Sequence, residues 1–188
     1  RFLVEVTMRY DGTPYLPEEY RWGLFPGVAL GWKLSTEPYI KLRASAGRLG
    51  SDRSLGYSYS YLSTMGMGSD PVVMLGTTPS YYINPSAPVN TSLRWQTTDT
   101  YNLGVDTKFW NGLLAAELDM FYMYTKDKME AQSGTYPPSM GNYYPSYVNY
   151  GEHDNKGFEL VLTHANKVNE FNYQIRGNLS WARNKILK

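Results

Sequence analysis

The sequence predicts an all-β protein whose antiparallel strands form part of an up-and-down transmembrane β-barrel. Three observations lead to this fold class. Seven segments alternate apolar and polar residues, the pattern of strands with one face in an apolar medium. The connections between them alternate long and short, as in outer-membrane barrels with short periplasmic turns and long extracellular loops. Aromatic residues gather near both ends of the segments, as they do at the two surfaces of a bilayer.

The first three expected strands alternate cleanly along their length. They cover residues 2–10, 22–34 and 39–49. In the first, Val4 and Val6 flank Glu5, so apolar and ionisable side chains fall on opposite faces. In the second, Pro26 predicts a bulge or a locally unpaired stretch, because proline has no backbone N–H to donate. A connection of about a dozen residues precedes the second strand, and the short turn 35–38 follows it.

The remaining four strands follow a long connection, residues 50–92. They cover residues 98–110, 113–126, 155–164 and 171–182. Asn111-Gly112 is the strongest hairpin signal in the chain, because a type I′ turn needs positive φ at both central positions. Residues 127–154 form another long connection, and 165–170 a short turn. Loops above roughly 15 residues are generally functional or disordered.

Composition excludes several classes of function. The 18 basic and 17 acidic residues nearly cancel and form no basic stripe, so we expect no nucleic-acid partner. The absence of cysteine excludes a disulfide framework and a thiolate metal site. His153 and His164, the two histidines, lie far apart without ligand spacing, so we expect no metal site. We also expect no catalytic residues, no cofactor and no enzymatic activity.

Two rows of aromatic residues favour lipid as the apolar medium. The row beside the short turns contains Trp32, Tyr39, Phe109 and Phe171, and the row beside the long connections contains Tyr10, Trp22, Tyr101, Tyr122, Tyr124 and Trp181. Within a strand the rows lie about 8 to 10 residues apart, which at a tilt of 40–45° is on the order of 20–25 Å of height. That height matches the apolar band of an outer-membrane barrel. A soluble all-β domain with one wet face is the alternative.

The opposite face carries ionisable side chains. These are Glu5, Arg9, Lys41, Arg43, Asp106, Lys108, Glu117, Asp119, Glu159 and Arg176. Glu117 and Asp119 lie next to each other on this face and could suggest acid–base chemistry. We interpret the whole set as residues that line an aqueous lumen.

Five motifs, in order along the chain, resemble those of SusC-like TonB-dependent transporters. They are RWGLFP from Arg21 together with GWKLS from Gly31, IKLRASAGRLG from Ile40, YNLGVD from Tyr101, DMFYMYTKD from Asp119 and NKGFELVL from Asn155. The resemblance implies a 22-stranded barrel with an N-terminal plug in a Gram-negative outer membrane of the Bacteroidetes type. It also implies active import of oligosaccharides or peptides, together with a SusD-like surface lipoprotein and the TonB–ExbB–ExbD complex.

Residues 1–188 would then be one part of the barrel domain of such a transporter. The chain offers about seven strands. We expect it to lack the plug domain, the remaining strands and the TonB box, through which the TonB complex would act. Seven strands cannot close a barrel of this type, and open edges in lipid leave backbone groups unpaired. We therefore expect a segment of a transporter. The alternative function is that of a soluble or surface-attached β-domain that binds glycans.

Tyrosines are concentrated in the two longest connections. They include Tyr57, Tyr59, Tyr61, Tyr81, Tyr82, Tyr143, Tyr144 and Tyr147. Three roles remain open for them: packing of the loops against one another, contact with the lid lipoprotein, and contact with the substrate. Tyrosine is enriched at protein interfaces, which keeps the second role in view.

Overall fold

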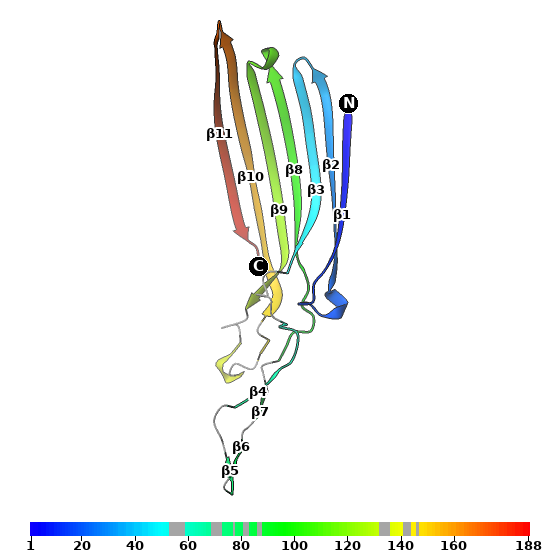
Figure 1. Cartoon of the computed structure of the whole chain (residues 1–188), viewed down its shortest axis with the longest axis vertical. Coiled ribbons are helices and arrows are strands. Elements are labelled where there is room, and N and C mark those ends of the chain that lie inside the picture. Colours follow the sequence, from blue (N-terminus) through cyan, green and yellow to red (C-terminus); the bar gives the residue numbers. More distant parts are fainter. Residues whose placement is uncertain are drawn as a thin grey trace.

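The main body of the protein is a single antiparallel sheet of seven long strands (Figure 1). The computed structural model describes residues 1–52, 59–68, 73–76, 78–80, 83–85, 88–131, 136–140, 144–145 and 147–188. The strands are β1 (Phe2–Gly12), β2 (Trp22–Thr36), β3 (Tyr39–Ser51), β8 (Gln96–Phe109), β9 (Leu114–Ala131), β10 (Tyr147–Val168) and β11 (Phe171–Ile186). They are ordered β1-β2-β3-β8-β9-β10-β11, so each strand pairs with its neighbours in sequence. The predicted up-and-down arrangement is confirmed, and β1 and β11 form the two edges of the sheet.

All three short turns lie at one end of the sheet (Figure 1). Residues 37–38 join β2 to β3, residues 110–113 join β8 to β9, and residues 169–170 join β10 to β11. Asn111 and Gly112 have φ of 54° and 90°, and the Leu113 amide donates to the Trp110 carbonyl at 3.0 Å. The predicted type I′ geometry at Asn111-Gly112 is therefore confirmed.

The strands are longer than predicted at their other end. β9 continues to Ala131 instead of ending at Lys126, and β10 begins at Tyr147 instead of Asn155. These extra pairs continue the hairpin beyond the apolar band, with register shifts between Asn149 and His153. Residues 147–150 (Tyr-Val-Asn-Tyr) do not alternate apolar and polar residues, so the pattern that reveals a strand is lost although the backbone ladder continues.

The long connection after β3 contains two short ladders. β4 (Met65–Met67) pairs with β7 (Ile83–Pro85), and β5 (Val73–Leu75) pairs with β6 (Thr78–Ser80). They form an arm that extends away from the end of the sheet opposite the short turns (Figure 1). Ladders of three residues are too short for a period of two to be recognised, so the sequence predicts only a loop there.

Within the described residues, the helical elements are three single turns of 3₁₀ helix: η1 (Glu18–Tyr20), η3 (Trp110–Gly112) and η4 (Pro138–Met140). No helix in the described part of the chain is long and apolar enough to cross a membrane.

Pro26 interrupts pairing on one side of β2 only. The β1–β2 ladder passes through the Met8–Pro26 pair without a shift, whereas the β2–β3 ladder begins at the next residue, Gly27, opposite Gly47. The locally unpaired stretch that the sequence predicts therefore lies on the β3 side of the strand.

The small hydrophobic core of the described residues lies at the end of the sheet that carries the long connections. Leu16, Leu93 and Met129 are buried together, and Tyr147 and Trp95 pack against them. Among the described residues of the sheet, most large apolar side chains are exposed. The core therefore organises the loop end of the molecule, while the sheet offers two uncovered faces.

Candidate functional site

Register places every ionisable residue singled out in the sequence on one face of the sheet, here called the polar face. Direct cross-strand pairs join Lys41 to Asp106, Asp106 to Glu117, and Asp119 to Glu159. Glu5, Arg9, Arg43, Lys108 and Arg176 share that face through the same ladders.

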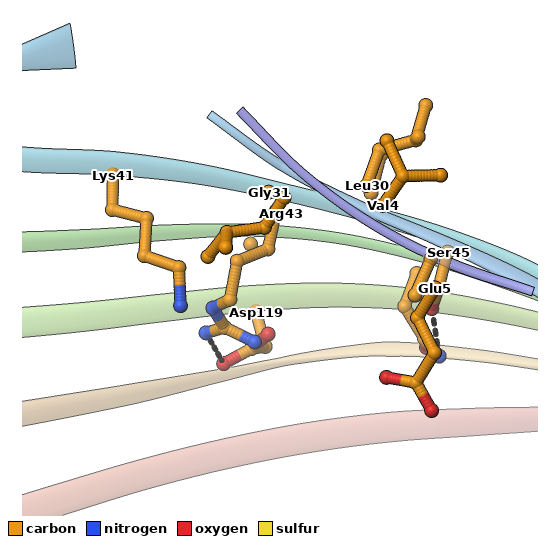
Figure 2. A pocket seen from close by; sticks show the side chains of 13 residues that line it. Val4, Glu5, Leu30, Gly31, Lys41, Arg43, Ser45 and Asp119 are labelled. Atoms are coloured by element: carbon orange, nitrogen blue, oxygen red, sulfur yellow. Dashed lines mark hydrogen bonds and ion pairs between the residues drawn. The ribbon is translucent and has the colours of Figure 1, made fainter. Parts of the chain in front are cut away.

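Arg43 is the centre of a charged cluster on the polar face. Its Nε donates to both carboxylate oxygens of Asp106 at 3.0 Å, and its Nη2 donates to Asp106 Oδ1 at 2.7 Å. The same Nη2 donates to Asp119 Oδ2 at 2.9 Å. Lys41 Nζ lies 3.9 Å from Asp106 Oδ2. Figure 2 shows Lys41, Arg43 and Asp119 on one side of the strands and Val4 and Leu30 on the other.

Gly104 makes this cluster possible. It lies between Arg43 on β3 and Asp119 on β9 in the same cross-strand row. A Cβ at this position would lie 2.6 Å from Asp119 Oδ1 and 2.8 Å from Arg43 Cζ. The guanidinium therefore crosses β8 above a residue that has no side chain. Sequence reasoning missed this role, although a glycine between two opposite charges in one row is the signal that could have revealed it.

The other ionisable residues of the polar face do not join this cluster. Arg9 forms an ion pair with Asp11, 2.6 Å apart. Among the described residues, no ion pair reaches Glu117 or Glu159, and both are exposed. The structure therefore brings Lys41, Arg43, Asp106 and Asp119 together and leaves the remaining candidates spread over the face. No group of three potential metal ligands occurs within the described ranges.

A second feature of the polar face is an aromatic contact near the long connections. Phe25 is buried, and its ring meets Trp95 edge-on with centroids 5.3 Å apart. The Trp95 indole N–H donates to the Arg21 carbonyl at 3.2 Å. A Cβ on Gly50 would collide with the Phe25 ring, so this glycine provides the space that the ring fills. Nothing in the alternation of β2 distinguished Phe25 from its neighbours.

The opposite face, here called the apolar face, is uncovered. Val6, Leu103 and Leu179 are 72%, 63% and 59% exposed, although they lie in the first, fourth and last strands of the sheet. Large contiguous apolar patches of this kind are rare on soluble monomers and mark a surface that meets an apolar partner.

Aromatic pairs border the apolar face at both ends. Near the long connections, Tyr10 stacks on Trp22, Tyr101 on Tyr122, and Phe158 on Trp181, with centroid distances of 5.1, 6.5 and 6.1 Å. Near the short turns, Phe2 stacks on Trp32 at 5.5 Å. One predicted member is wrong: Tyr39 lies on the polar face, where the Lys33 and Lys108 ammonium groups approach its ring.

The aromatic border shifts along the strands from one edge of the sheet to the other, by about one residue per strand on average. Trp181 on β11 is in register with Val4 on β1, through Phe158, Met120, Leu103, Ala44 and Leu30. Tyr10, the border residue of β1, lies six residues beyond Val4, so the border shifts by six residues over six strand pairings. One residue of about 3.3 Å per strand spacing of about 4.8 Å corresponds to a tilt of about 35°. This is the tilt of strands in outer-membrane barrels.

Charged residues replace apolar ones immediately beyond this border. Arg48 donates to both oxygens of Asp99, at 2.6 and 3.0 Å, in the row that follows Tyr101. This hydrogen bonding lowers the pKa of the Asp99 carboxyl. Tyr124 donates to Glu152 at 2.7 Å nearby. The apolar band therefore ends at the aromatic border.

The described loop tyrosines mostly pack within the loops. Tyr147 contacts the Leu16–Leu93–Met129 core, and Tyr61 donates to the Pro14 carbonyl at 3.2 Å. Tyr144 stacks on another loop tyrosine, and Tyr59 contacts Tyr61 while half of its surface stays exposed. Tyr57, Tyr81, Tyr82 and Tyr143 lie outside the described residues.

Comparison with known proteins identifies the sheet. The family described as "TonB dependent receptor-like, beta-barrel" matches residues 1–187. The chain belongs to this family. Membership implies an outer-membrane location in Gram-negative bacteria.

Individual relatives agree with this family. The TonB-dependent receptor SusC of Bacteroides thetaiotaomicron is 28% identical over the whole chain, and the TonB-dependent receptor P26 of Formosa agariphila is 27% identical. The RagAB peptide importer in its open-open state superimposes with a TM-score of 0.82 at 20% identity over the whole chain, and the closed-closed state with 0.79 at 19% over 98% of it.

The chain spans about a fifth of each of these proteins: 19% of the length of SusC and of P26, and 20% of the matched RagAB chains. The relatives and structural neighbours are named as receptors and importers.

Proposed function

We propose that this chain is a seven-stranded section of the barrel wall of a TonB-dependent importer. The observation that carries the proposal is the uncovered apolar face, bordered by two aromatic rows that slide by about one residue per strand. In this arrangement the apolar face contacts lipid, and the polar face with Arg43 and Asp119 lines the lumen. The short turns are periplasmic, and the long connections are extracellular.

The rest of the transporter would come from sequence beyond these residues. It would include the plug domain and the TonB box, and its remaining strands would pair with the exposed edges β1 and β11, since unpaired strand edges are unfavourable in lipid. Energy would come from the TonB–ExbB–ExbD complex. The barrel would operate in a Bacteroidetes-type outer membrane, because SusC of Bacteroides thetaiotaomicron is a relative over the full chain.

The proposed cargo is an oligosaccharide or a peptide, delivered with a SusD-like surface lipoprotein. The likeness to SusC supports the lipoprotein partner, and the superposition on a peptide importer supports a peptide as one of the two proposed cargoes. Among the loop tyrosines, Tyr59 is the described candidate for contact with this lipoprotein or the cargo, because its ring is half exposed beside Tyr61.

A soluble glycan-binding β-domain is the rival function, and the apolar face argues against it. A soluble domain would cover the row that contains Leu103 and Met120 with protein, but both side chains are more than half exposed. Burying one such side chain stabilises a fold by about 1.5–3 kcal/mol, so a soluble domain would bury this face against other protein.

The test places single cysteines on neighbouring residues of β8 in the full-length protein. The fluorescence of a label on Leu103→Cys should be quenched by brominated lipid. The fluorescence of the same label on Asn102→Cys, the neighbouring position on the polar face, should not be quenched. Equal quenching at both positions, or recovery of the protein in the aqueous fraction without detergent, would refute the wall assignment. Uptake of oligosaccharides and of peptides, measured with and without the lipoprotein, would then identify the cargo.

A further inference from the structure

Two basic residues oppose each other on the apolar face, just beyond the aromatic border. Lys156 on β10 is the direct partner of Arg183 on β11, in the row that follows the Phe158–Trp181 pair. Both lie on the apolar face, because each is two residues from a member of that pair, and both are exposed. Like charges in directly opposed positions destabilise a sheet, so the reason for this pairing must lie outside the ladder.

Lys156 has no acidic partner on the strands at either side of it. Its direct partner on β9 is Tyr122, and the nearest acid on the same face of β10, Asp154, lies opposite a further basic residue, Lys185. Among the described residues, no ion pair reaches Lys156, Arg183 or Lys185. Because β9 and β11 both belong to this chain, no strand from outside it can pair with β10 beside Lys156.

A basic residue at the same level elsewhere in the sheet is neutralised. Arg48 on β3 also lies one row beyond the border, directly opposite Asp99 on β8. It donates to both oxygens of that carboxylate, at 2.6 and 3.0 Å. The guanidinium of Arg48 is therefore satisfied within the sheet, whereas Lys156 and Arg183 present their N–H donors to a group outside it.

The height of the Lys156–Arg183 pair matches the headgroup layer of a bilayer. Aromatic side chains concentrate at the boundary between hydrocarbon and headgroups. Lys156 and Arg183 lie two residues beyond Phe158 and Trp181, which is about 5 Å higher at a strand tilt of about 40°. Lipid phosphates lie in that layer, and arginine and lysine bind phosphate through charge-assisted hydrogen bonds.

We propose that Lys156 and Arg183 bind the phosphate of a glycolipid in the outer leaflet of the outer membrane, while Phe158 and Trp181 contact its acyl chains. The inference rests on the proposed function, because the apolar face meets lipid only in a barrel wall. The long connections are extracellular in that arrangement, so the pair lies in the outer leaflet, where Gram-negative bacteria carry phosphorylated glycolipid. An anion between the two cations replaces their repulsion by attraction.

The test measures glycolipid binding to the delipidated full-length transporter in detergent. The two probes are purified lipid A that carries its phosphate and the same lipid A after the phosphate has been removed. Native mass spectrometry gives the affinity for each probe. The phosphorylated probe should bind more tightly, and its advantage should shrink as the salt concentration rises, because salt screens exposed charges.

Variants of the two basic residues make the test specific. Lys156→Gln and Arg183→Gln should each weaken binding of phosphorylated lipid A about five-fold, the contribution of one basic residue near an anionic membrane surface. Lys156→Arg should bind as the wild type does. Arg48→Gln is the matched control: it removes a positive charge at the same level, but one already paired with Asp99, so the affinity should change less than two-fold. Heat-modifiable migration checks that each variant barrel assembles.

Three outcomes would overturn the site. These are equal affinity for the two probes, equal losses in the Lys156→Gln and Arg48→Gln variants, and equal binding of phosphatidylglycerol, which would show recognition of any lipid phosphate. The proposed function is tested separately by the label at Leu103→Cys. If brominated lipid does not quench that label, the wall assignment itself fails. Quenching there, together with unchanged lipid A affinity in Lys156→Gln, refutes the headgroup site alone.

Discussion

Replacing Gly104 by alanine should disturb the Arg43 cluster without greatly changing stability on its own. The new Cβ would lie 2.6 Å from Asp119 Oδ1 and 2.8 Å from Arg43 Cζ, which forces the two side chains apart. The bond from Arg43 Nη2 to Asp119, now 2.9 Å, would be lost. Arg43 Nε also donates to both oxygens of Asp106, so contact between Arg43 and Asp106 should remain.

Two opposing effects set the change in the free energy of unfolding caused by Gly104→Ala. A hydrogen bond between charged groups contributes about 1.5–3 kcal/mol. Arg43 and Asp119 side chains are each 36% exposed, so solvent screening lowers the loss to about 1 kcal/mol. Against this, alanine in a strand interior stabilises by about 0.5–1 kcal/mol relative to glycine. The free energy of unfolding of the single variant should therefore be close to that of the wild type. Only a double-mutant cycle reveals the lost contact.

The assay is a urea titration of the full-length barrel refolded into lipid vesicles. In the Asp119→Ala background, Gly104→Ala should stabilise by about 0.5–1 kcal/mol, because the clash with Asp119 and the bond to it are both absent, and the flexible end of Arg43, released from that bond, can move away from the new Cβ. The coupling free energy should be about 1 kcal/mol, a factor of about five in the unfolding equilibrium.

Gly31 provides the matched control for this cycle. It lies opposite Arg43 in the same row, on β2, but its added Cβ would have no neighbour nearer than 3.5 Å. Gly31→Ala should stabilise the barrel in both backgrounds and show no coupling to Asp119. A Gly104–Asp119 coupling below about 0.3 kcal/mol, or equal coupling at Gly31, would refute the role assigned to Gly104.

Two further predictions concern the sheet and the loops. Gly157→Ala should destabilise the barrel by about 2 kcal/mol in the same titration, since the new Cβ would meet the Trp181 carbonyl oxygen of the neighbouring backbone as well as the Phe121 ring; an unchanged urea midpoint would contradict this. Asn149→Ala removes three hydrogen bonds of 2.7–3.0 Å to backbone groups, two of which join the Asn149 side chain to the backbone N–H and carbonyl of Arg94. Amide hydrogen exchange should then accelerate in residues 88–95 but not in the sheet, and uniform protection would rule out this anchoring role.

The main sheet was predictable because its physics is local. Lipid on one side and water on the other impose a period of two, and Leu103 flanked by Asn102 and Gly104 already shows it. The turn at Asn111-Gly112 was predictable for the same reason, since positive φ is a property of the residues themselves. Where apolar and polar residues do not alternate, as in the first eight residues of β10, the period carries no signal and the strand end was missed.

Sequence by itself therefore determined the seven strands of the main sheet, their order, the residues of the apolar face and the list of residues on the polar face. Tertiary structure alone decided which of them meet. Arg43 and Asp119 are far apart in sequence and are joined only because register places them in one row with Gly104 between them. Tyr39 shows the same limit, because its position near a turn indicated a lipid border, whereas pairing with Lys108 places it on the polar face. Periodicity assigns a residue to a face, but the alignment of neighbouring strands sets its partners.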